Sequence, residues 1–467
     1  MRTFLKTRFP RLWSAARVTK DRVRLEYYLL RSLNWRHLLS GFRGGTGQWE
    51  SLLPYQSVRR IPVPSCDIPT VDVLLELLKR DNVSFFEGSI ALYLPPDSIE
   101  RTVFRVLRYE YPEDAGLKLL KKAGGVGVSA YGAGLVRKVV DRYLLLAGNM
   151  LYEKGVGPRI YDLVELECGG QVWTAYVMQH VKGRTPTIEE CKAGVEKIRA
   201  METEGLLKTV ANRAYDCIDF QPPDCNGNAV IDGDGRFRYI DFQNFIPGDY
   251  EKYLDSAARL AADDSHFGGR RLLGGGRFLY QSIPAVNLPA KRSVQSRSPL
   301  YLKLMEQAGV SVKDRLVLDV GCNIGMMIAE YLRWGAKWCH GWDFPNVVLH
   351  TQRLLLALGC TRFSTTGAQL QHDRRLDEDL PAWLRNSMQG CAISYLAVHG
   401  HIGWVEALQR IPWGFLIYEG HEQDTRADVE RHLRELAKVI PFETRAMSTS
   451  EDGASRERLA AILVRKV

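Results

Sequence analysis

The stretch that decides the fold is Arg315-Leu-Val-Leu-Asp319-Val-Gly321-Cys-Asn323-Ile-Gly325-Met-Met-Ile-Ala-Glu330. Its apolar run Leu316–Val320 predicts a short buried strand. Gly321 and Gly325 follow and permit a tight turn with close approach of the backbone to a ligand. A helix is predicted to begin near Ile324. Strand, glycine loop and helix in this order predict a ligand site at the carboxyl edge of an open α/β sheet.

The next predicted strand, Trp338–Asp343, ends in an acid. Asp343 follows Asp319 by a little over twenty residues, which is the spacing of an acid that accepts hydrogen bonds from ribose hydroxyls. A glycine loop alone is weak evidence for such a ligand, and a loop followed by this acid is much stronger. The Gly-x-Gly-x-x-Gly spacing of dinucleotide-binding oxidoreductases is absent here, which disfavours that class.

These residues resemble class I S-adenosylmethionine-dependent methyltransferases, whose first motif is Asp-x-Gly-x-x-x-Gly after an apolar strand. The resemblance covers residues 296–467 and implies a Rossmann-like α/β domain with a mostly parallel sheet. It implies S-adenosylmethionine as the cofactor, with its methionine end at the first motif and its ribose at Asp343. The expected cofactor-binding residues of this half are Asp319, Gly321, Cys322, Asn323, Gly325 and Asp343.

Later segments continue the alternation of strands and helices. Cys391–Val398 and Phe415–Glu419 are predicted strands, each followed by histidines. A predicted helix, Arg426–Val439, precedes two closing strands, Phe442–Ser448 and Leu459–Arg465.

The base that would deprotonate the methyl acceptor is not decided by the pattern. Four side chains follow the carboxyl ends of predicted strands, where catalytic groups gather: His399, His401, Glu419 and His421. A histidine pKa near ~6.5 suits proton removal at neutral pH. His399 and His401 are therefore the expected catalytic residues, and a structural or exposed role is the alternative for each of them.

A second motif lies in the front half: Cys217-Ile-Asp219-Phe-Gln-Pro222-Pro-Asp224-Cys-Asn226-Gly-Asn228, followed by Tyr239-Ile-Asp241-Phe242. Phosphoryl transfer needs an acid to orient the attacking hydroxyl, and an amide and a second carboxylate to hold Mg²⁺. The segment resembles the catalytic loops of protein kinases and small-molecule kinases. This resemblance spans about residues 80–265 and implies an α+β two-lobed domain with ATP and Mg²⁺. It implies catalytic roles for Asp219 and Asp224, and metal-binding roles for Asn228 and Asp241.

The front half departs from the kinase pattern in two places. Arg105 stands on a predicted strand, 102–109, where a phosphate-binding lysine is expected, unless Lys118 or Lys121 supplies the charge. Arginine binds phosphate but is not interchangeable with lysine. Extra residues also separate Asp219 from Asn228. An inactive kinase fold, or an acidic turn between two strands, is therefore the alternative.

The length of 467 residues predicts two or three domains. The predicted division is a basic helical region at 1–75, a kinase-like domain at 76–267, a Gly/Pro linker at 268–295 and the methyltransferase domain at 296–467. Nine cysteines without a Cys-x-x-Cys pair fit free thiols in a reducing compartment. No signal peptide or membrane span is predicted, so the expected location is cytoplasmic.

Positive charge concentrates at the N-terminus. Residues 1–43 hold eleven basic residues against Asp21 and Glu26, within a net charge of +9. Such an arm suits docking to an anionic surface, such as the inner face of a membrane, or to a partner synthase, and a solvated helical face is the alternative. Nucleic acid is disfavoured as a partner because the arm lacks a stacking platform.

The pairing of the two motifs resembles the bifunctional kinase–methyltransferases that end bacterial O-antigen growth. That resemblance implies polysaccharide biosynthesis, with phosphorylation and methylation of a glycan or another hydroxyl-bearing acceptor. The order of the two domains differs from that family. The alternatives are a methyltransferase with an inactive kinase-like scaffold and a nucleic-acid methyltransferase.

Overall fold

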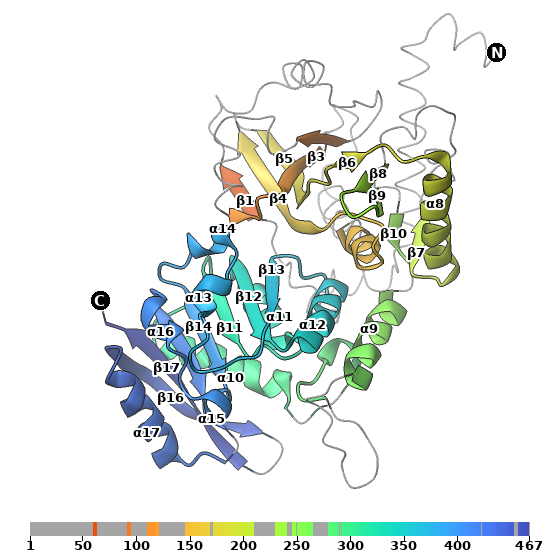
Figure 1. Cartoon of the computed structure of the whole chain (residues 1–467). Coiled ribbons are helices and arrows are strands. Elements are labelled where there is room, and N and C mark those ends of the chain that lie inside the picture. The colour runs from red at the N-terminus through yellow and green to blue at the C-terminus, as the bar shows by residue number, and fades with distance from the viewer. Residues whose placement is uncertain are drawn as a thin grey trace, which may run out of the picture. The chain divides into compact units, whose positions relative to one another are not determined.

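The structure is a computed structural model (Figure 1). It describes residues 59–62, 91–94, 110–120, 145–168, 171–209, 229–240, 245–248, 250–264, 279–288, 290, 292–421, 423–452 and 456–466. Contacts between Cα atoms divide the chain into two compact units. The first unit comprises Met1–Ser51, Ser57–Leu107 and Glu113–Tyr250, and the second comprises Leu52–Gln56, Arg108–Pro112 and Glu251–Val467.

Among the described residues of the first unit, a five-stranded sheet has the order β1-β4-β5-β3-β2. β4 (Ile160–Cys168) and β5 (Gln171–Gln179) pair antiparallel, and residues 145–153 form the helix before them. The remaining strands are β1 (Arg59–Pro62), β2 (Ala91–Leu94) and β3 (Ala115–Leu120). The strand predicted at 102–109 lies outside the described residues.

Shorter elements follow the hairpin. α8 (Ile188–Thr203) begins with a capping box in which Thr187 and Glu190 satisfy each other's backbone N–H groups. β7 (Leu207–Thr209) pairs antiparallel with β10 (Phe245–Pro247). A further small sheet has the order β6-β8-β9, built from β6 (Gly183–Arg184), β8 (Ala229–Asp232) and β9 (Phe237–Tyr239).

The described part of the second unit holds a seven-stranded sheet in the order β13-β12-β11-β14-β15-β17-β16. β17 pairs antiparallel with both of its neighbours, and the other pairings are parallel. The strands are β11 (Leu316–Val320), β12 (Trp338–Asp343), β13 (Phe363–Gly367), β14 (Ala392–Leu396), β15 (Phe415–Glu419), β16 (Phe442–Asp452) and β17 (Arg456–Arg465). The mostly parallel, Rossmann-like sheet expected for this half is confirmed.

Burial explains why three strands were predicted to the residue. Every residue of β11, β12 and β15 is buried, so their sequences do not alternate between apolar and polar residues. Such sequences are typical of parallel strands covered on both faces.

Helices flank this sheet (Figure 1). α10 (Val294–Gln307) packs against α11 (Met326–Arg333) and against β16, while α12 (Pro345–Ala357) packs against β12 and β13. α17 (Arg426–Ala437) confirms the predicted helix and begins with a Thr425–Asp428 capping box. The other helices of this part are α9 (Tyr250–Asp264), η2 (Pro284–Val286), α13 (Leu376–Asp379), α14 (Ala382–Arg385), α15 (His399–Ile402) and α16 (Ala407–Arg410).

The chain enters this sheet through a packed segment. The described residues between 279 and 293, called the strap here, include η2 and isolated bridges between Gln281 and Arg292 and between Ile283 and Leu288. Gln281, Ile283 and Arg292 are buried. This part of the predicted linker 268–295 is therefore packed structure, and the predicted domain boundaries stay predictions.

No helix among the residues that the structure describes is both long and apolar enough to cross a bilayer.

Candidate active site of the second unit

The predicted glycine loop connects β11 to α11. Gly321 and Gly325 have φ values of 75° and 80°, in the left-handed region where side chains are strained. A Cβ atom on Gly321 would lie 2.7 Å from Val398 Cγ2, and one on Gly325 would lie 2.7 Å from Thr351 Cγ2. Both positions therefore need glycine for conformation and for space, and the helix begins at Met326 rather than near Ile324.

Asp343 contacts this loop from the next strand. Its Oδ2 accepts a hydrogen bond from the Asn323 backbone N–H at 2.7 Å, and its Oδ1 accepts one from Phe344 N–H at 2.8 Å. Burial raises the pKa of Asp343, and the two backbone hydrogen bonds oppose that shift. The predicted acid and the predicted loop are thus brought together at the carboxyl edge of the sheet.

The other predicted loop residues have distinct environments. Asp319 is 3% exposed, and its Oδ2 has no hydrogen-bond partner in the structure. Burial raises the pKa of Asp319 to about 7, against a hydrogen bond with Ser394, and the charge of Asp343 adds to the rise. The Oδ1 of Asn323 is also buried without a partner. Cys322 is buried against Gly341, so this residue can offer a ligand only its backbone.

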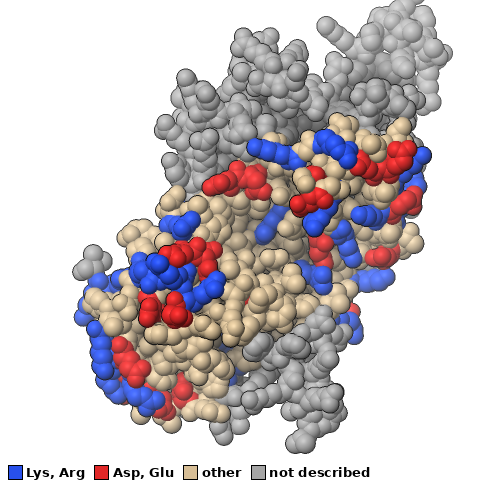
Figure 2. Space-filling view, in the orientation of Figure 1, with Lys and Arg blue, Asp and Glu red and all other residues tan. Residues whose placement is uncertain are grey.

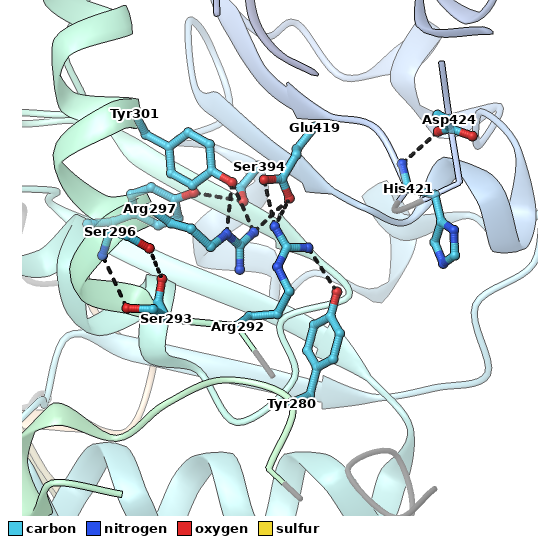
Figure 3. Close-up of polar contacts among 11 residues, drawn as sticks. Tyr280, Arg292, Ser293, Ser296, Arg297, Tyr301, Ser394, Glu419, His421 and Asp424 are labelled. Atoms are coloured by element: carbon cyan, nitrogen blue, oxygen red, sulfur yellow. Dashed lines mark hydrogen bonds and ion pairs between the residues drawn. The ribbon is translucent and has the colours of Figure 1, made fainter. Parts of the chain in front are cut away.

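A buried ion cluster at the end of β15 was not predicted (Figure 3). Glu419 is fully buried and accepts hydrogen bonds from Arg292 Nη2 at 2.7 and 2.8 Å and from Arg297 Nη2 at 2.9 Å. Two tyrosines complete it. The Tyr280 hydroxyl accepts from Arg292 Nη1 at 3.2 Å, and the Tyr301 hydroxyl accepts from Arg297 at 2.9 and 3.2 Å. The cluster joins the strap and α10 to the edge where Asp343 lies.

This cluster bears on Glu419 as a candidate base. Burial alone would raise the pKa of Glu419, but the positive charges of Arg297 and Arg292 outweigh it and lower the pKa to about 2. A carboxylate held in this way is a weak proton acceptor at neutral pH. This environment disfavours Glu419 as a base, and its position at a strand end does not by itself reveal its two buried arginine partners.

The strap reaches the glycine loop as well. Gln281 Oε1 accepts a hydrogen bond from Met326 N–H, at the start of α11, at 3.3 Å. That N–H belongs to the first turn of a helix, which has no partner within the helix itself. The strap is thus attached both to the start of α11 and, through Arg292, to the end of β15.

The predicted histidines differ in their surroundings: His399 packs against another histidine ring, and His401 is exposed. His399 stacks on His432 with ring centroids 3.8 Å apart, and burial and the neighbouring His432 lower its pKa to about 4. His401 is exposed, and its ring meets the half-buried His421 edge to face at 5.1 Å. Asp424 Oδ2 accepts from the His421 backbone N–H at 2.6 Å, which fixes the segment after β15.

A cavity of about 520 Å³ lies elsewhere on this unit. It is lined by residues that precede β11, β12 and β14, among them Lys313, Arg315 and Lys337. It therefore lies at the amino edge of the sheet, and ligands of open α/β sheets bind at the opposite, carboxyl edge. We do not assign the predicted cofactor to this cavity.

The predicted kinase residues cannot be placed. Asp219, Asp224, Asn228, Asp241 and Arg105 all lie outside the described residues. In the part of the chain that the structure describes, no group of three or more His, Cys, Asp or Glu side chains is arranged to hold a metal ion. The expectations for ATP and Mg²⁺ therefore stay predictions.

No family model matches this chain, and no curated protein matches it in sequence. It is similar in part to several solved structures. An rRNA methylase from Streptococcus thermophilus is 16% identical, covering 36% of this chain and 97% of its own, with a TM-score of 0.28. Magnesium protoporphyrin IX methyltransferase from Synechocystis, solved with bound S-adenosylmethionine, is 15% identical, covering 37% and 79%, with a TM-score of 0.28.

A putative RNA methyltransferase from Pyrococcus horikoshii is 10% identical, covering 47% of this chain and 98% of its own, with a TM-score of 0.29.

Proposed function

We propose that the second unit is an S-adenosylmethionine-dependent methyltransferase. The observation that carries the proposal is the contact between Asp343, at the end of β12, and the Asn323 amide in the glycine loop after β11. An acid and a glycine loop on adjacent parallel strands form a ribose-and-backbone site at the carboxyl edge. The antiparallel β17 and the Gly-x-x-x-Gly spacing differ from an all-parallel dinucleotide-binding oxidoreductase.

The residues present fit this cofactor. Gly321 and Gly325 leave space that a Cβ would fill, and Asp319 and Asn323 hold buried oxygens without partners. When bound, S-adenosylmethionine supplies an electrophilic methyl group on a sulfonium. Asp343 would accept from the ribose hydroxyls, and the loop backbone would lie against the methionine end. The main contribution of the chain is to position donor and acceptor in line.

For the acceptor we propose a hydroxyl or another nucleophilic oxygen, as on a glycan. His401 is the proposed base because it is exposed beyond β14, next to His421, where an incoming group can reach it. His399 stays the alternative base. Its pKa of about 4 keeps its imidazole neutral at neutral pH, although the ring is stacked on His432.

Calorimetric titration of the full chain with S-adenosylhomocysteine tests the proposal. We expect binding by the wild type and at least roughly tenfold weaker binding by Asp343→Ala, since a pair of ribose hydrogen bonds to a charged group is worth about 1.5–3 kcal/mol. Asp377→Asn is a matched control, because Asp377 pairs with Arg410 and belongs neither to the glycine loop nor to β12. Absence of binding by the wild type would reject the methyltransferase.

A second activity, phosphoryl transfer in the first unit, is proposed from a specific arrangement. β3, β5 and β4 are neighbours in one sheet, with residues 145–153 helical just before β4. Ala229 and Tyr239 are register partners in the β8–β9 hairpin. The proposed metal ligand Asn228 immediately precedes Ala229 in the sequence. The other proposed ligand, Asp241, follows Tyr239 by two residues. This order supports a kinase-like domain.

The lysine position also has a candidate. Lys118, rather than Arg105, lies on a described strand of that sheet, where it is the register partner of Tyr176 on β5. ATP turnover by the full chain with Mg²⁺, measured for the wild type, Asp241→Ala and Lys118→Met, tests the activity. Loss of turnover in both variants with unchanged binding of S-adenosylhomocysteine supports a kinase. Turnover by neither the wild type nor the variants leaves a methyltransferase with a scaffold domain.

The basic arm is proposed to dock to an anionic membrane surface or a partner synthase. Cosedimentation of the full chain with phosphatidylglycerol vesicles tests the membrane part, with a variant carrying Arg8→Glu, Arg11→Glu and Arg17→Glu as the comparison. Binding that the variant loses supports docking. The face in Figure 2 shows basic and acidic residues interspersed over the described part, which argues against a nucleic-acid substrate. A steep salt dependence of RNA binding would instead support a nucleic-acid methyltransferase.

A further inference from the structure

The cavity of about 520 Å³ at the amino edge of the seven-stranded sheet gathers positive charge. Lys313, Arg315 and Lys337 line it, from the turn before β11 and from the residue directly before β12. The Lys337 backbone N–H donates to the Arg315 carbonyl at 2.8 Å, which joins the two segments. Like charges held close together repel one another, and an anion placed between them relieves that repulsion.

The carboxylates near this cavity do not cancel its charge. Asp314 also lines it, and Glu110 Oε1 lies 3.2 Å from Lys337 Nζ. Glu110 belongs to the same compact unit as the cavity. Among the described residues that line the cavity or pair with its lining, three cationic side chains therefore face two carboxylates. The charge that remains favours an anionic ligand over a cationic one.

Arg315 is held in one place at the wall of the cavity. Its Nη1 donates to the Gly390 carbonyl at 2.6 Å, and its guanidinium carbon lies 5.8 Å from the centroid of the Phe415 ring. A Cβ atom on either Gly390 or Gly414 would lie 3.3 Å from that Nη1, so the guanidinium lies close against two stretches of bare backbone. An arginine has five N–H donors in a planar fork that matches phosphate, and a fixed fork loses little freedom on binding.

The neutral part of the lining is mostly polar. Asn386, Ser387 and Gln389 contribute two amides and a hydroxyl, and Leu316 contributes an apolar side chain. Sites for flat apolar groups are lined mainly by hydrophobic and aromatic side chains, so this lining suits a ligand rich in hydroxyl groups. The volume lies within the roughly 300–1,000 Å³ that is typical of small-molecule sites.

We propose that this cavity binds a phosphorylated, hydroxyl-rich small molecule of the sugar phosphate class. Arg315 and Lys313 hold the phosphate through charge-assisted hydrogen bonds, and the amides of Asn386 and Gln389 hold the hydroxyl groups. Because Asp343 and the glycine loop lie at the opposite edge of the sheet, this is a second site. It binds its ligand without competition from S-adenosylmethionine, and it does not depend on the proposed methyl transfer.

The experiment is calorimetric titration of the full chain at low ionic strength with glucose 6-phosphate, and with glucose as the uncharged partner. It compares the wild type, Arg315→Gln, Lys313→Gln and Arg465→Gln. Arg465→Gln is the matched control: its Nη1 also donates to a backbone carbonyl, that of Ile411 at 2.5 Å, and its guanidinium also lies over an aromatic ring, that of Trp413. Arg465 does not line the cavity.

We expect the wild type to bind glucose 6-phosphate at least roughly tenfold more tightly than glucose, and less tightly as salt is added. Arg315→Gln should weaken this binding by roughly 10- to 100-fold, the equivalent of one charge-assisted hydrogen bond. Lys313→Gln should weaken it too, and Arg465→Gln should leave it unchanged. Saturation with S-adenosylhomocysteine should not alter the affinity for glucose 6-phosphate.

Equal binding of glucose and glucose 6-phosphate, or no binding of either, would overturn the proposal. Equal weakening by Arg315→Gln and Arg465→Gln would also overturn it, because the loss would then come from the structure around the arginines. Competition by S-adenosylhomocysteine would place the phosphate at the carboxyl edge instead.

A nucleic-acid backbone is another source of phosphate, and a short single-stranded RNA separates the two. RNA binding that Arg315→Gln weakens, without binding of glucose 6-phosphate, would assign the cavity to nucleic acid and reject the small molecule. Failure of S-adenosylhomocysteine to bind would reject the proposed methyltransferase and leave this site standing.

Discussion

Arg292 in the strap and Glu419 at the end of β15 are 127 residues apart in sequence, and the arginine Nη2 donates to both carboxylate oxygens, at 2.7 and 2.8 Å. Both side chains are fully buried. Removing two charges from water is costly, and only the ion pair and its further hydrogen bonds offset that cost. The stability of this unit therefore depends on keeping all members of the cluster together.

Glu419→Gln should lower the free energy of unfolding of the second unit by about 3–5 kcal/mol, because two buried guanidinium groups lose their counter-ion. Thermal and urea unfolding of the full chain measure it. Glu443→Gln is the control, since Glu443 pairs with Arg445 at 3.0 Å on the exposed surface, where a pair is worth about 0–1 kcal/mol. Equal effects of the two substitutions would contradict the assigned role.

The same carboxylate predicts a pH dependence of stability. Its pKa in the folded protein is about 2, below the ordinary value of 4.5. When an acid has a lower pKa in the folded protein, it contributes its full stabilisation at pH values above its pKa in the unfolded chain. That stabilisation is lost as the pH falls through the lower pKa of the folded protein. Stability of the second unit should thus fall between about pH 4.5 and 2. This part of the fall should be absent in Glu419→Gln, and an identical acid profile in that variant would contradict the prediction.

Asp319 predicts a pH dependence of stability opposite to that of Glu419. Its folded pKa is raised from 3.8 to about 7, so its stabilising contribution is full below the unfolded value and is lost as pH rises through about 7. Asp319→Asn should therefore stabilise the ligand-free protein above neutral pH, by roughly 2–4 kcal/mol. Arg297 and Asp343 are the charged groups that act on it. Nearby Tyr331, Cys322 and Cys339 stay protonated, because burial raises their pKa values.

Calorimetry of the ligand-free protein at two pH values on either side of 7 measures this effect. Stabilisation that does not grow with pH would show that the carboxyl is not ionised in the way described.

Gly321→Ala should reduce stability by more than backbone strain alone requires. Its φ is 75°, and a Cβ would lie 2.7 Å from Val398 Cγ2. Gly309→Ala is the matched control, because its φ is 66° and nothing lies within 4 Å of its Cβ position. We expect about 1 kcal/mol for the control and about 2–4 kcal/mol for Gly321→Ala, since an overpacked contact adds to the strain. Thermal or urea unfolding of both variants measures these losses of stability. Equal losses in Gly321→Ala and Gly309→Ala would contradict the close approach to Val398.

His401→Gln should lower methyl transfer by about 10²–10⁴-fold if His401 is the base. The assay is transfer of labelled methyl from S-adenosylmethionine to a total glycan extract. His372→Gln is the control, because His372 is an exposed histidine paired with Glu406. If His399 acts instead, His399→Gln abolishes transfer, and the wild-type rate stays flat through neutral pH and falls only near pH 4.

Much of the second unit could be predicted from its sequence. β11 and β15 are mostly apolar runs that are each followed directly by a glycine, and β12 ends in an acid two residues before a proline, so the ends of these strands are visible in the sequence itself. The Asp343–loop contact also followed from spacing, because parallel neighbours end at the same edge of the sheet. Elements whose identity depends on local pattern were therefore the predictable ones.

The ion cluster could not be predicted in the same way. Arg292 and Arg297 belong to a polar, proline-flanked run that is typical of a linker, and charged residues are rarely buried unless paired. Their burial depends on Glu419, which is supplied by a strand more than a hundred residues later. One signal was present: Glu419 is an acid within the otherwise apolar run Phe415–Glu419, and a buried acid needs a partner somewhere in the chain.

The strap has a practical consequence for dissecting this protein. Gln281 satisfies an amide at the start of α11, and Arg292 neutralises the end of β15. The second unit therefore cannot be excised at its first recognisable motif without losing these contacts. A recombinant fragment that begins at Ser296 would keep every glycine-loop residue and lose both attachments. A fragment that begins before Leu279 would keep them, and is the shorter piece we would express for crystallisation with S-adenosylhomocysteine.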